Sequence, residues 1–111
     1  MKLIIAIVQD EDASRLVNQL MKNGYGVTKL ATTGGFLRAG NTTLLIGVDD
    51  EKLHSVMEII EQVCKSRKQI TAAPSSMGNM GGMPGAASYP VEVTVGGATV
   101  FVMSVDQFVK L

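Results

Sequence analysis

The sequence has one cysteine, three prolines and no tryptophan among its 111 residues, and its ten basic residues are balanced by ten acidic ones. Because Cys64 is alone, it cannot form an internal disulfide, and its apolar helical surroundings predict a buried side chain. Because the formal net charge is zero, the chain has no general attraction for a nucleic acid polymer or an anionic lipid surface. We therefore expect neither as a partner, and a bound anion must be held by local groups.

Long apolar runs are also missing. Residues 3–8 are continuously apolar but far shorter than the ~20 residues that span a membrane, and no small-residue cleavage site of a signal peptide follows them. We expect no membrane partner, and the unpaired cysteine favours a reducing, cytoplasmic location. A length of 111 residues with 46% hydrophobic residues suits one packed core, so we predict a single domain over residues 1–111.

The spacing of apolar residues predicts two helices. Asp10 is expected to cap the first, and Gly24 is expected to end it in a left-handed conformation. Asp50 and Glu51 are expected to open the second, and the basic residues after Cys64 complement its C-terminal dipole. The core-facing positions are Ala13, Leu16, Val17, Leu20 and Met21 in the first helix, and Leu53, Val56, Met57, Ile60, Val63 and Cys64 in the second.

Strands are predicted where β-branched and alternating apolar residues gather. Residues 2–8 are expected to form a central strand buried on both faces, residues 25–32 and 42–48 two more strands, and residues 69–72 a short fourth one. Residues 89–95 and 98–102 flank Gly96 and Gly97, a dipeptide typical of a two-residue hairpin turn. Glycine-rich stretches predict flexible loops at about 33–41 and 73–88.

The strand-to-helix junction at residues 8–13 (VQDEDA) shares its Val, Asp-Glu and apolar positions with residues 48–53 (VDDEKL). Together with the order of the elements, this repeat favours a split βαβ arrangement. We therefore predict an α+β, ferredoxin-like fold, in which an antiparallel sheet carries two helices on one face and a C-terminal β-hairpin follows. Such a sheet leaves edges unpaired, and pairing them with identical chains favours an oligomer.

Residues 32–43 (TTGGFLRAGNTT) combine the residue types of a nucleotide site. Gly34 and Gly35 allow backbone amides to approach an anion. Arg38 can hydrogen-bond a phosphate, and Phe36 offers a flat face to a base. The segment runs into a strand and has no Gly-Lys-Ser/Thr, so ATP hydrolysis is not indicated. The alternative from composition alone is a glycine turn whose Phe36 and Leu37 pack back on the domain.

Residues 30–43 (LATTGGFLRAGNTT) closely resemble the PII-like receptors of bacteria that bind the second messenger cyclic di-AMP. Residues 1–10 and 89–102 are similar to the same family, so the resemblance covers essentially the whole chain. The family forms homotrimers that bind one cyclic di-AMP in each cleft between neighbouring subunits. The resemblance therefore implies a non-enzymatic signal-transduction protein whose loops change conformation on binding, with a downstream protein target that the sequence does not identify.

The resemblance also implies seven ligand-binding residues, which supply hydrogen bonds, backbone amides and an aromatic face. Thr28, Asn41 and the backbone at Gly47 are expected to meet an adenine. The loop around the ligand is expected to be lined by Gly35, Phe36 and Leu37, with Arg38 as an addition.

Two positions depart from the family pattern, which commonly has Asn and Arg where this chain has Gly24 and Gly26. Both positions are expected near the ligand. Losing a hydrogen bond from a charged donor costs about 1.5 to 3 kcal/mol and losing a neutral one about 0.5 to 1.5 kcal/mol, so we predict binding weakened by about tenfold to well over a hundredfold. The C-terminal residues 108–111 also differ from the usual ending, which removes any basis for transferring a ligand contact to them.

Other functions have weaker support from the residues. A PII-like trimer that has lost cyclic di-AMP binding and acts through protein or metal binding is the main alternative, and Gly24 and Gly26 favour it. Acylphosphatases share the ferredoxin-like architecture, but their arginine lies in the loop that opens the first helix. That loop is acidic in this chain, at residues 9–12, so we expect no catalytic residue.

Metal binding is also not expected. Met77, Met80 and Met83 have soft thioethers suited to Cu(I), but methionines in a loop serve more often as adaptable contacts. His54 has no cysteine or second histidine at ligand spacing. We therefore predict no metal and no cofactor, with cyclic di-AMP as the ligand.

Overall fold

The computed structural model describes residues 1–30, 40–74 and 88–111, with the backbone alone at 71–74 and 88–89. The chain divides into two compact units. The larger unit comprises Met1–Lys65 and Gly96–Leu111, and the smaller unit comprises Ser66–Val95. The single domain predicted over residues 1–111 stays a prediction, because the two units are defined only by their internal contacts.

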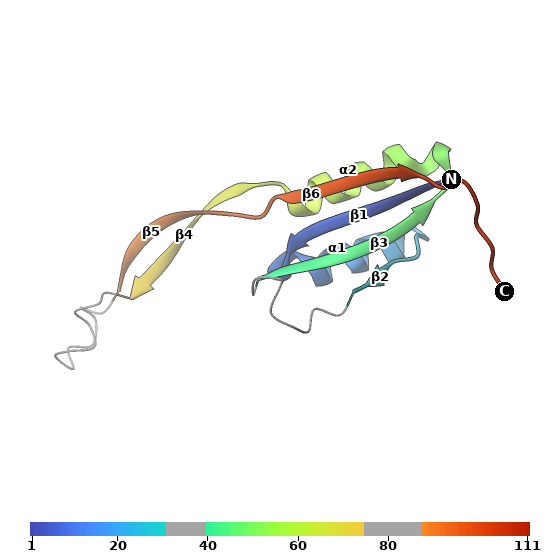
Figure 1. Ribbon diagram of the computed structural model, residues 1–111. Helices are drawn as coiled ribbons and strands as arrows, with labels where there is room; N and C mark the ends of the chain where they lie inside the picture. Colours follow the sequence, from blue (N-terminus) through green and yellow to red (C-terminus); the bar gives the residue numbers. More distant parts are fainter. Residues whose placement is uncertain (31–39, 75–87) are drawn as a thin grey trace. The chain divides into compact units, whose positions relative to one another are not determined.

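The larger unit is built on a four-stranded antiparallel sheet in the order β2-β3-β1-β6 (Figure 1). Its strands are β1 (Lys2–Gln9), β2 (Thr28–Lys29), β3 (Asn41–Val48) and β6 (Ala98–Ser104). Its helices are α1 (Asp10–Lys22) and α2 (Leu53–Cys64), the latter preceded by the 3-10 turn η1 (Asp50–Lys52). This order and pairing confirm the predicted α+β, ferredoxin-like class.

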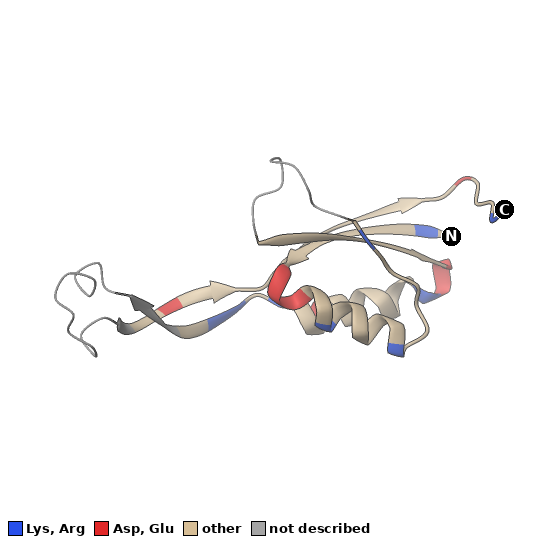
Figure 2. Cartoon of the chain, turned by 90° about the horizontal axis from the view of Figure 1, so that it is seen from below, with Lys and Arg blue, Asp and Glu red and all other residues tan. Residues whose placement is uncertain are grey.

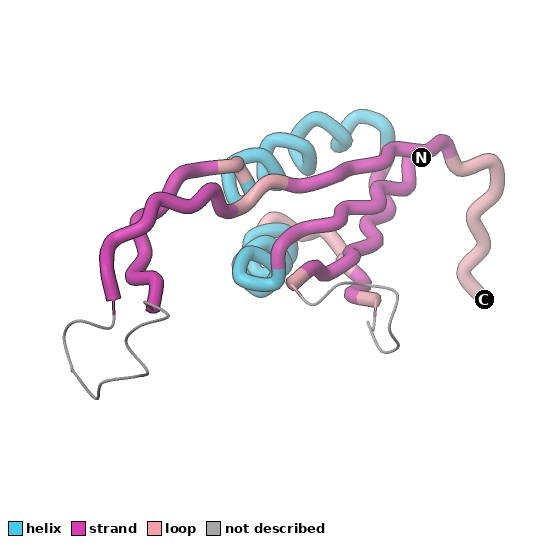
Figure 3. The backbone as a smooth tube through the Cα atoms, turned by 60° about the vertical axis from the view of Figure 1, so that its left-hand side comes forward, coloured by secondary structure: helices cyan, strands magenta, loops and turns pink. Residues whose placement is uncertain are grey.

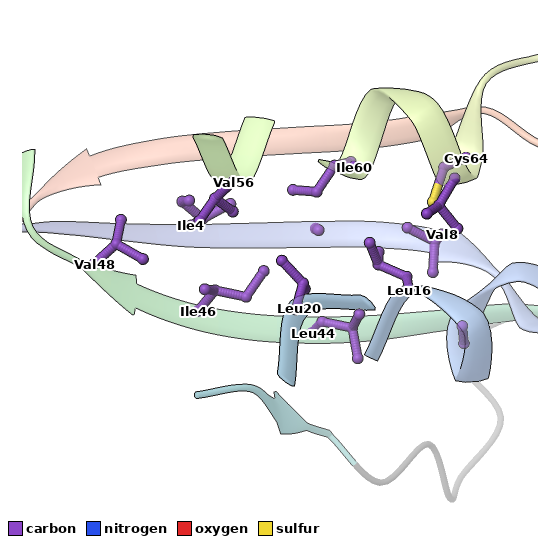
Figure 4. Close-up of a cluster of buried hydrophobic side chains, with 13 residues drawn as sticks. Ile4, Val8, Leu16, Leu20, Leu44, Ile46, Val48, Val56, Ile60 and Cys64 are labelled. Atoms are coloured by element: carbon purple, nitrogen blue, oxygen red, sulfur yellow. The ribbon is translucent and has the colours of Figure 1, made fainter. Parts of the chain in front are cut away.

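Both helices cover the same face of this sheet, since their buried residues belong to one core with those of β1 and β3. Figure 3 shows the helices and strands from another direction, with the helices in cyan. Alternate residues of β1 and β3 point into this layer, because side chains of a strand alternate between its faces. Ile4 pairs with Ile46 in the register of the two strands, and both side chains are fully buried. The core in Figure 4 comprises Ile4, Ala6, Val8, Ala13, Leu16, Leu20, Leu44, Ile46, Val48, Val56, Ile60, Val63 and Cys64.

On the opposite face of the sheet, the described residues of the larger unit form no such cover. Leu3, Ile5 and Ile7 of β1 are only half-buried, so the prediction of a strand buried on both faces is wrong for the single chain. Its predicted central position is confirmed, because β1 lies between β3 and β6. Met21 of α1, predicted to face the core, is exposed instead.

The ends of α1 are formed differently from each other. Asp10 is the first residue of the helix rather than its cap, and its carboxylate accepts a hydrogen bond from the Thr42 hydroxyl. At the other end, the Tyr25 amide donates to the Leu20 carbonyl (2.9 Å). The Gly24 amide donates to the Met21 carbonyl (3.0 Å), and Gly24 has a φ of +85°. These two bonds form a Schellman motif, which confirms the predicted helix end at glycine.

The smaller unit is a two-stranded antiparallel ribbon of β4 (Arg67–Pro74) and β5 (Ser88–Val95). A β-hairpin-like ribbon is therefore present, but its predicted partners at Gly96 and Gly97 are wrong, since β5 pairs with β4 and β6 pairs with β1. The two glycines have positive φ values of 82° and 91°. Both glycines belong to the larger unit, and their amides donate within it. The Gly96 amide donates to Gln9 Oε1 (2.8 Å), and the Gly97 amide donates to the Cys64 carbonyl. The pairing of β6 with β1 thus overrides the local propensity of Gly96 and Gly97 for a hairpin turn.

Several predictions fall wholly or partly outside the described residues. The loops expected at about 33–41 and 73–88 lie there except for their ends, which belong to a turn at Gly40 and to the strands β3, β4 and β5. Met77, Met80 and Met83 lie there entirely. In the parts that the structure describes, no helix has the length and apolar character required to cross a membrane.

Candidate functional site

Three of the seven predicted ligand residues can be placed. Thr28 lies in β2, and Asn41 and Gly47 lie at the two ends of β3. All three are exposed. The other four, Gly35, Phe36, Leu37 and Arg38, lie outside the described residues.

The strand register brings the three described residues to one face of the sheet. Thr28 pairs with Leu45, which is two residues from Gly47, and paired residues of neighbouring strands share a face. Asn41 and Gly47 are an even number of residues apart, so they share that face as well. It is the face away from the helices, because the buried residues of β3 are Thr42, Leu44, Ile46 and Val48.

Strand geometry separates these residues along that face. Gly47 is two residues, or roughly 7 Å, from the position paired with Thr28. Asn41 is six residues, or about 20 Å, from Gly47. A single copy of the chain therefore groups Thr28 with Gly47 and leaves Asn41 at the far end of β3.

A hollow of about 470 Å³ lies at the Gly47 end of the sheet. This volume falls within the ~300 to 1,000 Å³ of small-molecule sites. The hollow is formed where the end of α1, the end of β3 and η1 meet. Its lining consists of Met1, Asn23, Gly24, Tyr25, Gly26, Gly47, Val48, Asp49 and Lys52.

Glycine at positions 24 and 26 keeps this hollow open. A Cβ atom added at Gly24 or at Gly26 would meet no heavy atom within 4 Å. At Gly47, by contrast, an added Cβ would lie 3.3 Å from the Met1 Cε atom. The two positions that depart from the expected family pattern thus border the same hollow as the backbone of Gly47.

Charged groups are unevenly distributed around this hollow. Acidic residues occupy η1 beside the hollow, whereas those of the first turn of α1 lie at the other end of that helix (Figure 2). The Met1 ammonium lies 2.9 Å from Asp50 Oδ1, and this hydrogen bond, together with the positive charge, lowers the pKa of the Asp50 carboxyl. Lys52 and Asp49 both line the hollow. Lys52 was not among the predicted ligand residues, and the sequence signals for this region were Gly47 and the pair of unusual glycines.

Two other polar clusters of the larger unit make contacts within and between its helices. Arg15 Nη2 contacts Asp12 Oδ1 at 3.2 Å and the Val63 carbonyl at 2.9 Å, which ties α1 to the end of α2. His54 Nε2 lies 2.9 Å from Glu58 Oε1 on the exposed surface of α2. Across residues 1–30, 40–74 and 88–111, no group of three or more His, Cys, Asp or Glu side chains is arranged to hold a metal ion.

Comparison with known proteins gives the family of this chain and a solved structure of similar fold. The profile of a protein family described as cyclic-di-AMP receptor matches residues 1–111. A crystal structure described as a functionally unknown protein from Pediococcus pentosaceus ATCC 25745 is 44% identical and superposes with a TM-score of 0.76. The similarity covers 99% of this chain and 96% of that one. The match to the family profile over the whole sequence shows that this chain belongs to the cyclic-di-AMP receptor family.

Proposed function

We propose that this protein is a non-enzymatic signalling receptor that binds cyclic di-AMP in clefts between the subunits of a homotrimer. The observation that carries the proposal is the match of the cyclic-di-AMP receptor family to residues 1–111. The geometry of the described residues supplies two further arguments, one for a site shared between subunits and one for the assembly itself.

The positions of the proposed ligand residues favour a shared site. Asn41 lies about 20 Å from Gly47 along β3, so an adenine that contacts both residues must take them from different subunits. Thr28 lies on the same face and pairs next to the Gly47 end. A cleft between two copies would unite the groups that one copy holds apart.

The uncovered face of the sheet favours the homotrimer. In the register of the strands, Leu3 pairs with Met103 and Ile5 pairs with Phe101. Phe101 and Met103 are 53% and 45% exposed, and they adjoin the half-buried side chains of β1. Apolar areas of this kind on a sheet are typical of protein interfaces, since burying them in an assembly removes them from water.

Binding can be tested by isothermal titration of the purified protein with cyclic di-AMP, with cyclic di-GMP and ATP as controls. The proposal expects selective binding of close to one cyclic di-AMP per subunit. Absence of heat at millimolar ligand, confirmed by an independent probe, would contradict it. Hydrogen exchange at saturating ligand tests the accompanying loop change, and unchanged exchange over residues 33–41 and 73–88 would count against that part.

The second candidate is a PII-like trimer that has lost the ligand and acts through protein or metal binding. The observation in its favour is the open space at Gly24 and Gly26, two positions of the hollow that have no side chain to donate to a ligand. The same titration separates the two candidates, because a trimer that gives no signal with cyclic di-AMP supports the second.

An acyl phosphatase is a weaker candidate. Asp10, Glu11 and Asp12 form the first turn of α1, where such an enzyme needs amides and an arginine around an anion. Arg15, on the same helix, already contacts Asp12 and the Val63 carbonyl. An assay with acyl phosphate is expected to show no turnover above the uncatalysed rate.

A further inference from the structure

The hollow at the Gly47 end of the sheet has no side-chain donors at the two positions of its lining that are Gly24 and Gly26. Gly24 and Gly26 contribute no side chain, and the space around both is open. A cyclic dinucleotide carries two phosphates, each with a negative charge. Because the chain as a whole has a net charge of zero, a phosphate that lies at this hollow gains electrostatic attraction only from local groups, and a cation in the lining would supply it.

Lys52 is the cation best placed for this role. It is the last residue of η1, it is exposed, and it lines the hollow together with the two glycines. Its ammonium group forms no ion pair with any residue that the structure describes. The α-ammonium of Met1 already has an ion-pair partner, because it lies 2.9 Å from Asp50 Oδ1.

The carboxylate of Asp49 repels a phosphate at the hollow, so a cation is needed there to offset this repulsion. Asp49 lines the same hollow, and its negative charge opposes the approach of a phosphate. The backbone of Lys52 is held by a hydrogen bond from its amide to the Asp49 carbonyl (2.9 Å), while its side chain remains free to reach into the hollow. Lysine, with a flexible four-carbon stem and three donors, suits a phosphate whose position the backbone does not fix.

We propose that Lys52 holds a phosphate of the bound cyclic dinucleotide, in the place that a donor side chain at position 26 would otherwise reach. This inference rests on the proposed function and adds to it a residue that determines affinity. It predicts that affinity for cyclic di-AMP falls as the salt concentration rises and that Lys52 accounts for part of this fall. It also predicts that a basic side chain at position 26 makes Lys52 partly redundant.

The first test compares Lys52→Gln and Lys52→Arg with the wild type by titration with cyclic di-AMP at two salt concentrations. Lys52→Gln is expected to weaken binding by roughly tenfold or more and to reduce its salt dependence, since a charged hydrogen bond is lost. Lys52→Arg keeps the charge and is expected to remain within about threefold of the wild type. The matched control is Lys22→Gln, an exposed lysine of α1 outside this hollow, which should change affinity by less than about twofold.

The second test is a double-mutant cycle with Gly26→Arg. Gly26 is exposed and an added Cβ atom there meets no heavy atom within 4 Å, and the variant is expected to bind more tightly than the wild type. Lys52→Gln should then cost clearly less than it does in the wild-type background, because two residues that serve one phosphate are not additive. Thermal unfolding of each variant checks that all remain folded.

The outcomes separate the inference from the proposed function. If Lys52→Gln binds cyclic di-AMP as tightly as the wild type does, the role of Lys52 is overturned and the receptor function stands. If Lys52→Gln lowers the affinity by the same factor in the wild type and in the Gly26→Arg variant, the two residues do not serve one phosphate. A wild type that binds no cyclic di-AMP overturns both the proposed function and this inference.

Discussion

Gly24 ends α1 with a φ of +85°, a conformation that side chains with a Cβ atom disfavour. We expect Gly24→Val to lower the free energy of unfolding by about 1 to 2 kcal/mol, because a β-branched residue is strained there. Gly24→Asn should cost less, since asparagine tolerates the left-handed region. Urea unfolding measures both, with Gly26→Val as the control at a glycine without positive φ and with open space around it. Equal costs for Gly24→Val and Gly26→Val would contradict this account.

Asp50 provides a prediction about pH. The hydrogen bond from the Met1 ammonium lowers the pKa of its carboxyl below the ordinary value of 3.8. A carboxyl with a lowered pKa in the folded state stabilises the fold above the ordinary value, and this stabilisation disappears as the pH falls through the lowered pKa. The difference in melting temperature between the wild type and Asp50→Asn should therefore shrink between pH 5 and pH 2. A difference that stays constant over this range would show that the ion pair contributes nothing.

Besides their shared apolar core, the two helices are linked by the polar side chain of Arg15. Arg15 of α1 donates to the Val63 carbonyl in the last turn of α2 and contacts the buried carboxylate of Asp12. We expect Arg15→Ala to destabilise the protein by about 1 to 2 kcal/mol, because two charge-assisted contacts are lost while Asp12 stays buried. Chemical denaturation measures the change, and Lys22→Ala on the same helix is the control, with an expected change below about 0.5 kcal/mol. An equal effect of both variants would mean that loss of positive charge alone is responsible.

The helices show how far local sequence determines this fold. Val56 and Ile60 recur at helical spacing and are buried as predicted, because a helix presents such residues on one face wherever it packs. The glycines at 96 and 97 show where prediction fails. Their positive φ values suit a hairpin turn, yet long-range pairing of β6 with β1 decides the strand partners. Strand pairing depends on residues far apart in the sequence, which the local pattern does not specify.

The candidate site shows the same division. Resemblance indicated Thr28, Asn41 and Gly47 individually, and the strand register adds that they share one face while Asn41 stands about 20 Å from Gly47. Lys52 could not be predicted from its neighbours, because its position at the hollow depends on the meeting of η1 with the end of α1. Gly24 and Gly26 indicated the region of the hollow, but they did not indicate Lys52 as the residue proposed to hold a phosphate there.

In the whole molecule, the half-buried face of β1 links the fold to the proposed assembly. The apolar pattern of residues 2–8 predicts burial on both faces, but the larger unit buries only the helix-facing side. A second layer from neighbouring copies would complete that burial. The proposed homotrimer thus accounts for an apolar pattern that the isolated chain leaves unexplained.

The final prediction tests this assembly with Phe101→Glu and Met103→Glu. Both side chains lie on the uncovered face, at 53% and 45% exposure, so either variant should remain folded as a single chain. Burying a carboxylate in an apolar interface is strongly unfavourable, so each variant should sediment mainly as a monomer where the wild type sediments as a trimer at micromolar concentration. Met21→Glu, at an exposed position of α1 on the helical side, is the control and should leave the trimer intact. Trimeric sedimentation of the Phe101 and Met103 variants would show that the subunits meet elsewhere. Loss of the trimer should also abolish cyclic di-AMP binding, because Asn41 and Gly47 can then no longer reach the same adenine.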